Sequence, residues 1–129
     1  MTGEELIAQF EAGALSAASF HHADHVRMAF LYLSRYPVLE VLRRFSAALA
    51  SFAAANGKPE RYHETITWAY VFLIRERMAR ATPPATWEEF RRTNPDLLNT
   101  GNDFLRKYYR DETLSCALAR GMFLLPDGF

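Results

Sequence analysis

The sequence predicts an all-α protein: a small helical bundle with three long helices and several short C-terminal helices. Two observations predict it. Apolar residues recur at helical spacing over long stretches, and helix caps, prolines and glycines divide these stretches. The chain has 129 residues, 50% of them apolar, which suits one domain with a substantial core. We therefore expect a single α-helical domain over residues 1–129.

The first helix is expected over residues 3–11 and the second over residues 22–35. Pro37 suits the first position of a third helix, which should end at the pair Asn56-Gly57, because such residues cap helix C-termini. Apolar residues recur along the third helix at helical spacing: Val38, Val41, Leu42, Phe45, Leu49 and Phe52.

The fourth helix is expected over residues 62–81. Its middle, TITWAYVFLI, is rich in β-branched and aromatic residues and could pass for a strand. It continues without a turn signal into RERMARA, whose residues are strong helix formers, so we predict a helix. Apolar residues surround nearly its whole circumference, which indicates the central buried helix. Arg75 and Arg77 are expected at its solvated end.

The C-terminal part is expected to contain short helices. Thr86 and Glu89 form the sequence signature of a capping box, so a helix of about two turns should follow. Another short helix should start at Asn94-Pro95, and a further one should lie between Gly101-Asn102 and Tyr109. A last helix, capped by Asp111, should end at Gly121. The apolar tail over residues 122–129 is expected to pack on the body or on a second subunit of a homodimer.

Composition limits the classes of function. Lys+Arg and Asp+Glu both number 15, so the basic excess typical of nucleic-acid binding is missing and no nucleic-acid partner is expected. No apolar stretch approaches the ~20 residues that a membrane span needs, so no membrane partner is expected. The first ten residues are acidic and lack the cationic and apolar regions of a signal peptide, and we expect a cytoplasmic protein.

Histidines give the candidate site. Three of the four occur in FHHADHVRMA, residues 20–29, and the fourth in YHETITWAY, residues 62–70. On a helical wheel His22 and His25 fall on the core side of the second helix, and His63 faces inward from the fourth. Short loops should make successive long helices antiparallel. The second and fourth helices would then be parallel, with His22, His25 and His63 at the same end of the bundle.

Such a cluster favours a metal site. Three imidazoles from His22, His25 and His63 suit a divalent metal such as zinc or iron and leave a position for water. Glu64 and Asp24 are the candidate catalytic carboxylates, as ligand, orienting group or general base. The expected function is then binding of, or action on, a small molecule, as a metal-dependent hydrolase or oxidoreductase. The paired Glu-x-x-His motifs of di-iron bundles are missing, which disfavours that class.

Two other readings stay open. The histidines could serve metal-free acid–base chemistry or binding of a small ligand, and two helix N-termini would favour an anion. They could also be structural polar groups of an interaction module. Asp24 lies near the third position of its helix, where the helix dipole alone favours an acid, and Glu64 is in the same situation.

The two histidine stretches also carry a resemblance. Phe20, His22, Asp24, His25, Arg27 and Ala29, followed by Tyr62 to Thr67, fit the pattern F-x-H-x-D-H-x-R-x-A … Y-H-E-T-I-T. The chain resembles small, uncharacterised bacterial α-helical proteins with this pattern. The resemblance implies that His22, Asp24, His25, His63 and Glu64 act as one constellation, and it implies no particular reaction.

Overall fold

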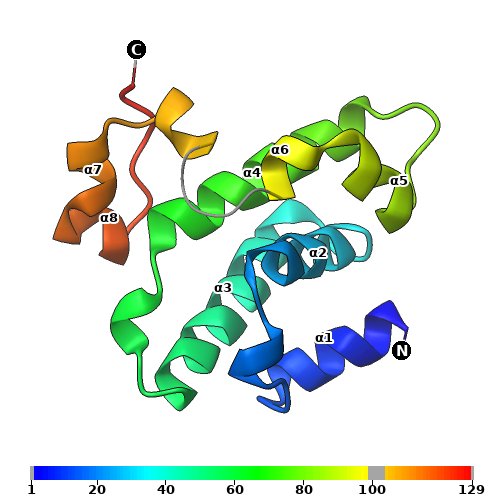
Figure 1. Cartoon of the computed structure of the whole chain (residues 1–129), viewed down its shortest axis with the longest axis horizontal. Coiled ribbons are helices and arrows are strands. Elements are labelled where there is room, and N and C mark those ends of the chain that lie inside the picture. The colour runs from blue at the N-terminus through cyan, green and yellow to red at the C-terminus, as the bar shows by residue number, and fades with distance from the viewer. Residues whose placement is uncertain (1, 99–103, 129) are drawn as a thin grey trace.

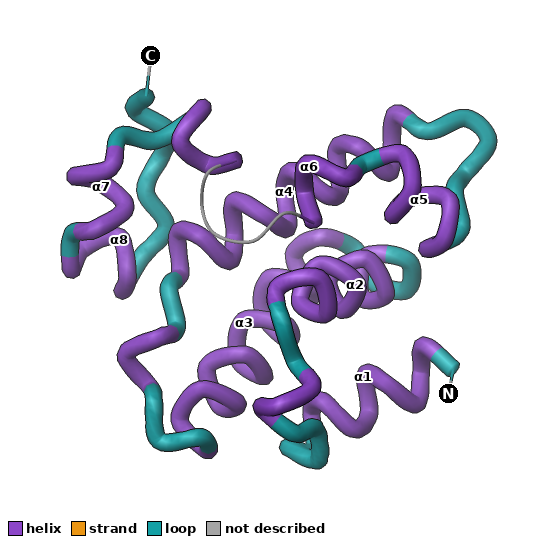
Figure 2. Tube along the Cα trace, in the orientation of Figure 1, coloured by secondary structure: helices purple, strands orange, loops and turns teal. Residues whose placement is uncertain are grey.

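The computed structural model describes residues 2–98 and 104–128, with the side chain of Ser19 left out. The described residues form helices and no strands, so the predicted all-α class is confirmed (Figures 1 and 2). The longer helices are α1 (Gly3–Glu11), α2 (His22–Leu33), α3 (Val38–Ala55), α4 (Glu64–Arg80) and α5 (Trp87–Thr93). The short ones are η1 (Ala17–Ser19), η2 (Pro59–Arg61), α6 (Pro95–Leu98), η3 (Phe104–Lys107), α7 (Asp111–Ser115) and α8 (Ala117–Gly121).

Local capping explains where the long helices begin and end. Helix α2 ends at Leu33, two residues earlier than expected, and the Ser34 hydroxyl donates to the Phe30 carbonyl at 2.8 Å. Pro37 disfavours a helical conformation at the residue before it, which explains the early end. Helix α4 begins at Glu64 because His63 is its N-cap. The predicted bounds of α1 and the predicted capping box of α5 are confirmed.

The C-terminal helix predicted over residues 111–121 is wrong. The chain forms α7 and α8, which are separated by extended backbone at Cys116 (φ −80°, ψ 152°), and the N-cap is Arg110 rather than Asp111. The Leu114 carbonyl lies 2.8 Å from Nε2 of His63, whereas in an unbroken helix it would accept from the residue four positions on. Over the described residues 104–109, the chain forms the 3-10 turn η3 in place of the expected α-helix. The predicted break at Gly101-Asn102 lies outside the described residues.

Helix α2 shares the centre of the molecule with α4, which alone was expected to be central. Helix α2 contacts α1 and α3 as well as α4, α5 and α6 (Figure 1). Its buried residues therefore extend beyond one face: Val26, Met28, Ala29, Phe30 and Tyr32.

Arg77 is not the solvated residue expected from the sequence. Its guanidinium forms two hydrogen bonds of 2.8 Å with the Asp96 carboxylate and a third, 3.0 Å long, with the Asn94 side chain. It also lies 5.2 Å from the centre of the Phe104 ring. Arg77 therefore fastens the α5–α6 segment to α4.

The C-terminal tail packs on its own chain. The Tyr109 hydroxyl donates to the Leu124 carbonyl at 2.7 Å, and the Leu124 amide donates to the Thr65 hydroxyl at 3.1 Å. The Gly128 amide donates to the Tyr108 carbonyl at 2.8 Å, where an added Cβ would lie 2.8 Å from the carbonyl carbon. Within the described ranges, no helix has the length and apolar character needed to span a membrane.

Candidate functional site

The three histidines predicted to converge line one open pocket. Its volume is about 660 Å³, and residues from the N-terminal ends of both α2 and α4 contribute to it. We call it the histidine pocket. It is lined by Ala17, Phe20, His22, His25, Leu49, Phe52, Ala53, Asn56, Lys58, Arg61, Tyr62, His63, Ile66 and Thr67. A smaller hollow of about 80 Å³ shares His22, His25 and Thr67 with it and reaches Tyr70 and Ile74 in the core.

His63 is held by the backbone through both ring nitrogens. Nδ1 accepts from the Ile66 amide at 3.1 Å, which caps α4. Nε2 lies 2.8 Å from the Leu114 carbonyl. Since a carbonyl only accepts, Nε2 carries the proton and the ring is the neutral Nε2–H tautomer. Burial lowers the pKa of His63 from its ordinary value and favours the same neutral form.

His22 is held by one ring nitrogen. Its Nε2 donates to the Leu97 carbonyl at 3.0 Å, and its ring meets the edge of Tyr70 with centroids 5.1 Å apart. The bond to Leu97 leaves Nδ1 as an acceptor in the neutral ring. The contact to Leu97 also ties α2 to α6, so His22 is both a pocket residue and a link between helices.

His25 is the most strongly perturbed histidine. Its ring packs on Phe20, with centroids 4.3 Å apart. Burial, helped by repulsion from His22, lowers the pKa of His25 to about 4, although the Asp24 charge and a backbone hydrogen bond at Phe20 act in the opposite direction. His25 is therefore neutral at pH 7.

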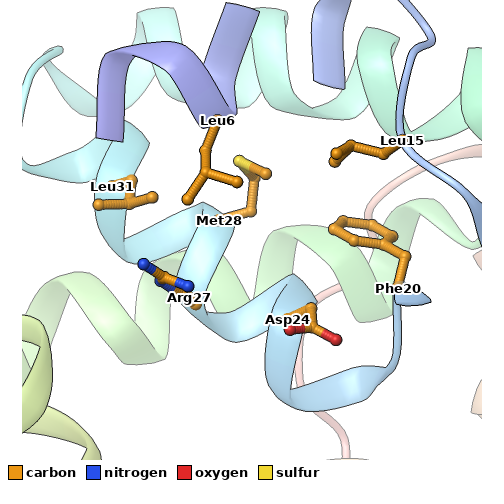
Figure 3. A pocket seen from close by; sticks show the side chains of 7 residues that line it. All are labelled: Leu6, Leu15, Phe20, Asp24, Arg27, Met28 and Leu31. Atoms are coloured by element: carbon orange, nitrogen blue, oxygen red, sulfur yellow. The ribbon is translucent and has the colours of Figure 1, made fainter. Parts of the chain in front are cut away.

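The two predicted carboxylates take local partners and do not line the histidine pocket. Oδ2 of Asp24 accepts from the His21 amide at 2.9 Å, which caps α2. Asp24 and Arg27 line a separate pocket of about 140 Å³, whose apolar lining includes Leu6 of α1 (Figure 3). The Glu64 carboxylate accepts a hydrogen bond from Tyr62, which does line the histidine pocket. Glu64 thus reaches the pocket only through Tyr62.

Two cations at the pocket were missed by the sequence reasoning. Lys58 and Arg61 are exposed and line the histidine pocket from the η2 turn. The Arg61 amide donates to the Lys58 carbonyl at 3.0 Å, and Arg120 donates to the Glu60 carbonyl at 2.7 Å, so the turn is held in place. The signal was present in KPERYH, where both cations lie within four residues before the Tyr62-His63 pair.

The hydrogen bonds of the histidines determine which of them could bind a metal ion. Within residues 2–98 and 104–128, no three or more His, Cys, Asp or Glu side chains are grouped so that they could hold a metal ion. Among the pocket histidines, His22 and His25 each have a ring nitrogen that takes no part in these hydrogen bonds and could bind a metal. A metal bound by His63 as well would require that ring to leave the Ile66 amide or the Leu114 carbonyl.

No protein-family model, curated protein or solved structure matches the chain. The fold and the site therefore define the class by themselves: an all-α protein with a histidine-lined pocket at the N-terminal ends of α2 and α4. The resemblance to small bacterial proteins with the Y-H-E-T-I-T pattern stays a prediction.

Proposed function

We propose that the protein binds a small molecule in the histidine pocket and that this binding needs no resident metal. The observation that carries the proposal is the hydrogen bonding of His63, whose two ring nitrogens both serve the backbone. A histidine committed in this way forms a wall of a pocket and is a poor metal ligand. The pocket itself is concave and mixes apolar walls with a few polar groups, as small-molecule sites do.

The remaining polar groups then act as hydrogen-bonding partners of the ligand. The free Nδ1 of His22 accepts in its neutral form, and the neutral ring of His25 offers a second partner. Phe20, Leu49 and Ile66 supply apolar contact. We propose binding in preference to catalysis because the two carboxylates expected to act as acid or base lie outside the lining of the pocket.

A pocket-filling variant tests the proposal. Ala53 lines the pocket, whereas its neighbour Ala54 is exposed on α3. We expect compounds from a small-molecule library to raise the melting temperature of the wild type and of Ala54→Trp, but not of Ala53→Trp. A library with no stabilising compound, or one whose hits stabilise Ala53→Trp equally, would contradict the proposal.

A divalent-metal site is the second candidate, favoured by His22 and His25 lying one turn apart and lining the same pocket. With two protein imidazoles and a ligand oxygen, zinc or iron would supply Lewis-acid or redox chemistry for a hydrolase or oxidoreductase. Elemental analysis of protein purified without an affinity tag or chelator separates the candidates. Near-stoichiometric metal that is lost in both His22→Ala and His25→Ala would favour the metal site. Metal-free protein after reconstitution with zinc, iron and manganese would favour the first proposal.

A further inference from the structure

The charged residues that line the histidine pocket carry one sign of charge. The exposed rim holds Lys58 and Arg61, and among the described residues that line the pocket there is no carboxylate. The chain as a whole has a formal net charge of zero, so the positive rim is a local feature. A pocket lined by one sign of charge raises the local concentration of ligands of the opposite sign. Charge therefore selects against a cationic ligand.

The interior of the pocket has a different character from its rim. Phe20, Leu49, Phe52 and Ile66 provide apolar walls, and the smaller hollow behind them reaches Val26 and Phe45. The imidazoles between these walls are held neutral at His25 and His63 by burial. A highly charged group placed deep in this interior would lose its hydration without a matching charge. The interior therefore suits an apolar body, and the charge of the ligand belongs at the rim.

From this arrangement we infer that the ligand is an amphipathic monoanion, a carboxylate carried on an apolar or aromatic body, with the carboxylate at Arg61 and Lys58 and the body between Phe20 and Ile66. The inference rests on the proposed function and narrows it to a class of ligand. In the η2 turn, a hydrogen bond of 3.0 Å from the Arg61 amide to the Lys58 carbonyl fixes the backbone of both cations. The guanidinium of Arg61 can then receive a carboxylate through two parallel hydrogen bonds.

Three naphthyl probes of similar size test the inference: 2-naphthoate, 2-naphthamide and 2-naphthylmethylammonium. Each is titrated into the full-length ¹⁵N-labelled protein at pH 7 and followed by the backbone amide shifts of the pocket residues. We expect 2-naphthoate to bind about tenfold more tightly than the amide, which corresponds to about 1.4 kcal/mol. The ammonium probe should bind most weakly, because it meets Lys58 and Arg61.

Matched variants locate the anion. Arg61→Gln and Lys58→Gln should each weaken 2-naphthoate binding about three- to tenfold and leave 2-naphthamide binding unchanged. Arg43→Gln is the control, because Arg43 is an exposed α3 arginine outside the lining of the pocket. An amide that binds as tightly as the carboxylate, or carboxylate binding insensitive to both rim variants, would overturn the ligand class and leave the proposed pocket standing. Failure of all three probes to shift the pocket amides would overturn both.

Discussion

The imidazole of His63 links the start of α4 to α7. Its Nδ1 caps α4 at the Ile66 amide, and its Nε2 holds the Leu114 carbonyl 51 residues away. Replacement by alanine removes the cap and leaves a carbonyl in the interior without a donor. We expect His63→Ala to lower the free energy of unfolding by about 2–3 kcal/mol, measured by urea denaturation.

His63→Asn separates the two contributions, because asparagine caps a helix but is too short to reach Leu114. It should recover about 1 kcal/mol of the loss. His21→Ala is the control, since His21 is exposed at the N-cap of α2 and should change stability by less than about 1 kcal/mol. Native stability in His63→Ala would contradict the structural role assigned to this ring. His63 would then again be a candidate metal ligand.

His25 gives the stability of the protein a pH dependence. The unfolded chain takes up a proton at this ring as the pH falls through its ordinary pKa of 6.5, whereas the folded protein keeps it neutral down to a pKa of about 4. Between these values the unfolded state binds more protons, so stability falls as the pH falls. The contribution is complete above pH 6.5 and is lost by about pH 4.

We expect wild type to lose about 1–2 kcal/mol of stability through His25 between pH 7 and pH 4.5, a value reduced from the full shift because the ring is half-buried. The test compares urea midpoints of wild type and His25→Gln across this range. The variant should show a shallower slope, and the lowered pKa of His63 should leave part of the slope in both proteins. Identical slopes would mean that His25 titrates normally in the folded state.

Periodicity and loop length were enough to predict that His22, His25 and His63 share a pocket, since both depend on short stretches of sequence. The carboxylates were harder to predict. The residue type alone does not distinguish a carboxylate that acts on a ligand from one that bonds the nearest donor, and this applies to Asp24 and Glu64. In the structure the nearest donor prevails, since Asp24 accepts from the His21 amide and Glu64 from Tyr62.

At the scale of elements, Thr65 is the main polar link between α4 and the C-terminal segment. The fully buried hydroxyl lies 2.7 Å from the Ala119 carbonyl and 2.8 Å from the Met122 carbonyl, and it accepts from the Leu124 amide at 3.1 Å. Valine has nearly the same shape but none of these bonds. We expect Thr65→Val to lower stability by about 2 kcal/mol, measured by urea denaturation.

The same change should also increase the hydrogen-exchange rate of the Leu124 amide. Thr93→Val is the matched control, because the Thr93 hydroxyl bonds the Glu89 carbonyl on the exposed surface of α5 and its loss should change stability by less than about 0.5 kcal/mol. An unchanged exchange rate at Leu124 in Thr65→Val would show that packing alone holds the tail.

The bounds of the elements show where sequence reasoning succeeds and where it fails. The bounds of α1, the C-terminal end of α3 and the capping box of α5 follow from residues within one turn, so the sequence predicts them. Pro37, expected at the first position of α3, is instead its N-cap. At the break between α7 and α8, the Leu114 carbonyl bonds His63, which is distant in sequence. No pattern within residues 111–121 contains that information, which is why the prediction of one helix is wrong.

At the scale of the whole molecule, the C-terminal segment over residues 111–128 forms a separate layer at one end of α4 (Figure 1). Few of its residues are buried, chiefly Leu114 and Ala119, whereas α2 buries five apolar side chains and α4 buries four. His63 and Thr65 fasten this layer through backbone carbonyls. The end of α4 that lines the pocket therefore also carries a segment that buries few of its residues.

Such a layer should open without unfolding of the core, because regions with few buried apolar contacts have the lowest opening free energies. We expect native-state hydrogen exchange in low denaturant to show amides of α7 and α8 opening at least about 2 kcal/mol below those of α2 and α4. His63→Ala should widen this gap, whereas Ala54→Trp on the exposed face of α3 should leave it unchanged. Equal opening free energies throughout would mean that the C-terminal layer and the core form one cooperative unit, so that any ligand in the histidine pocket stabilises both together.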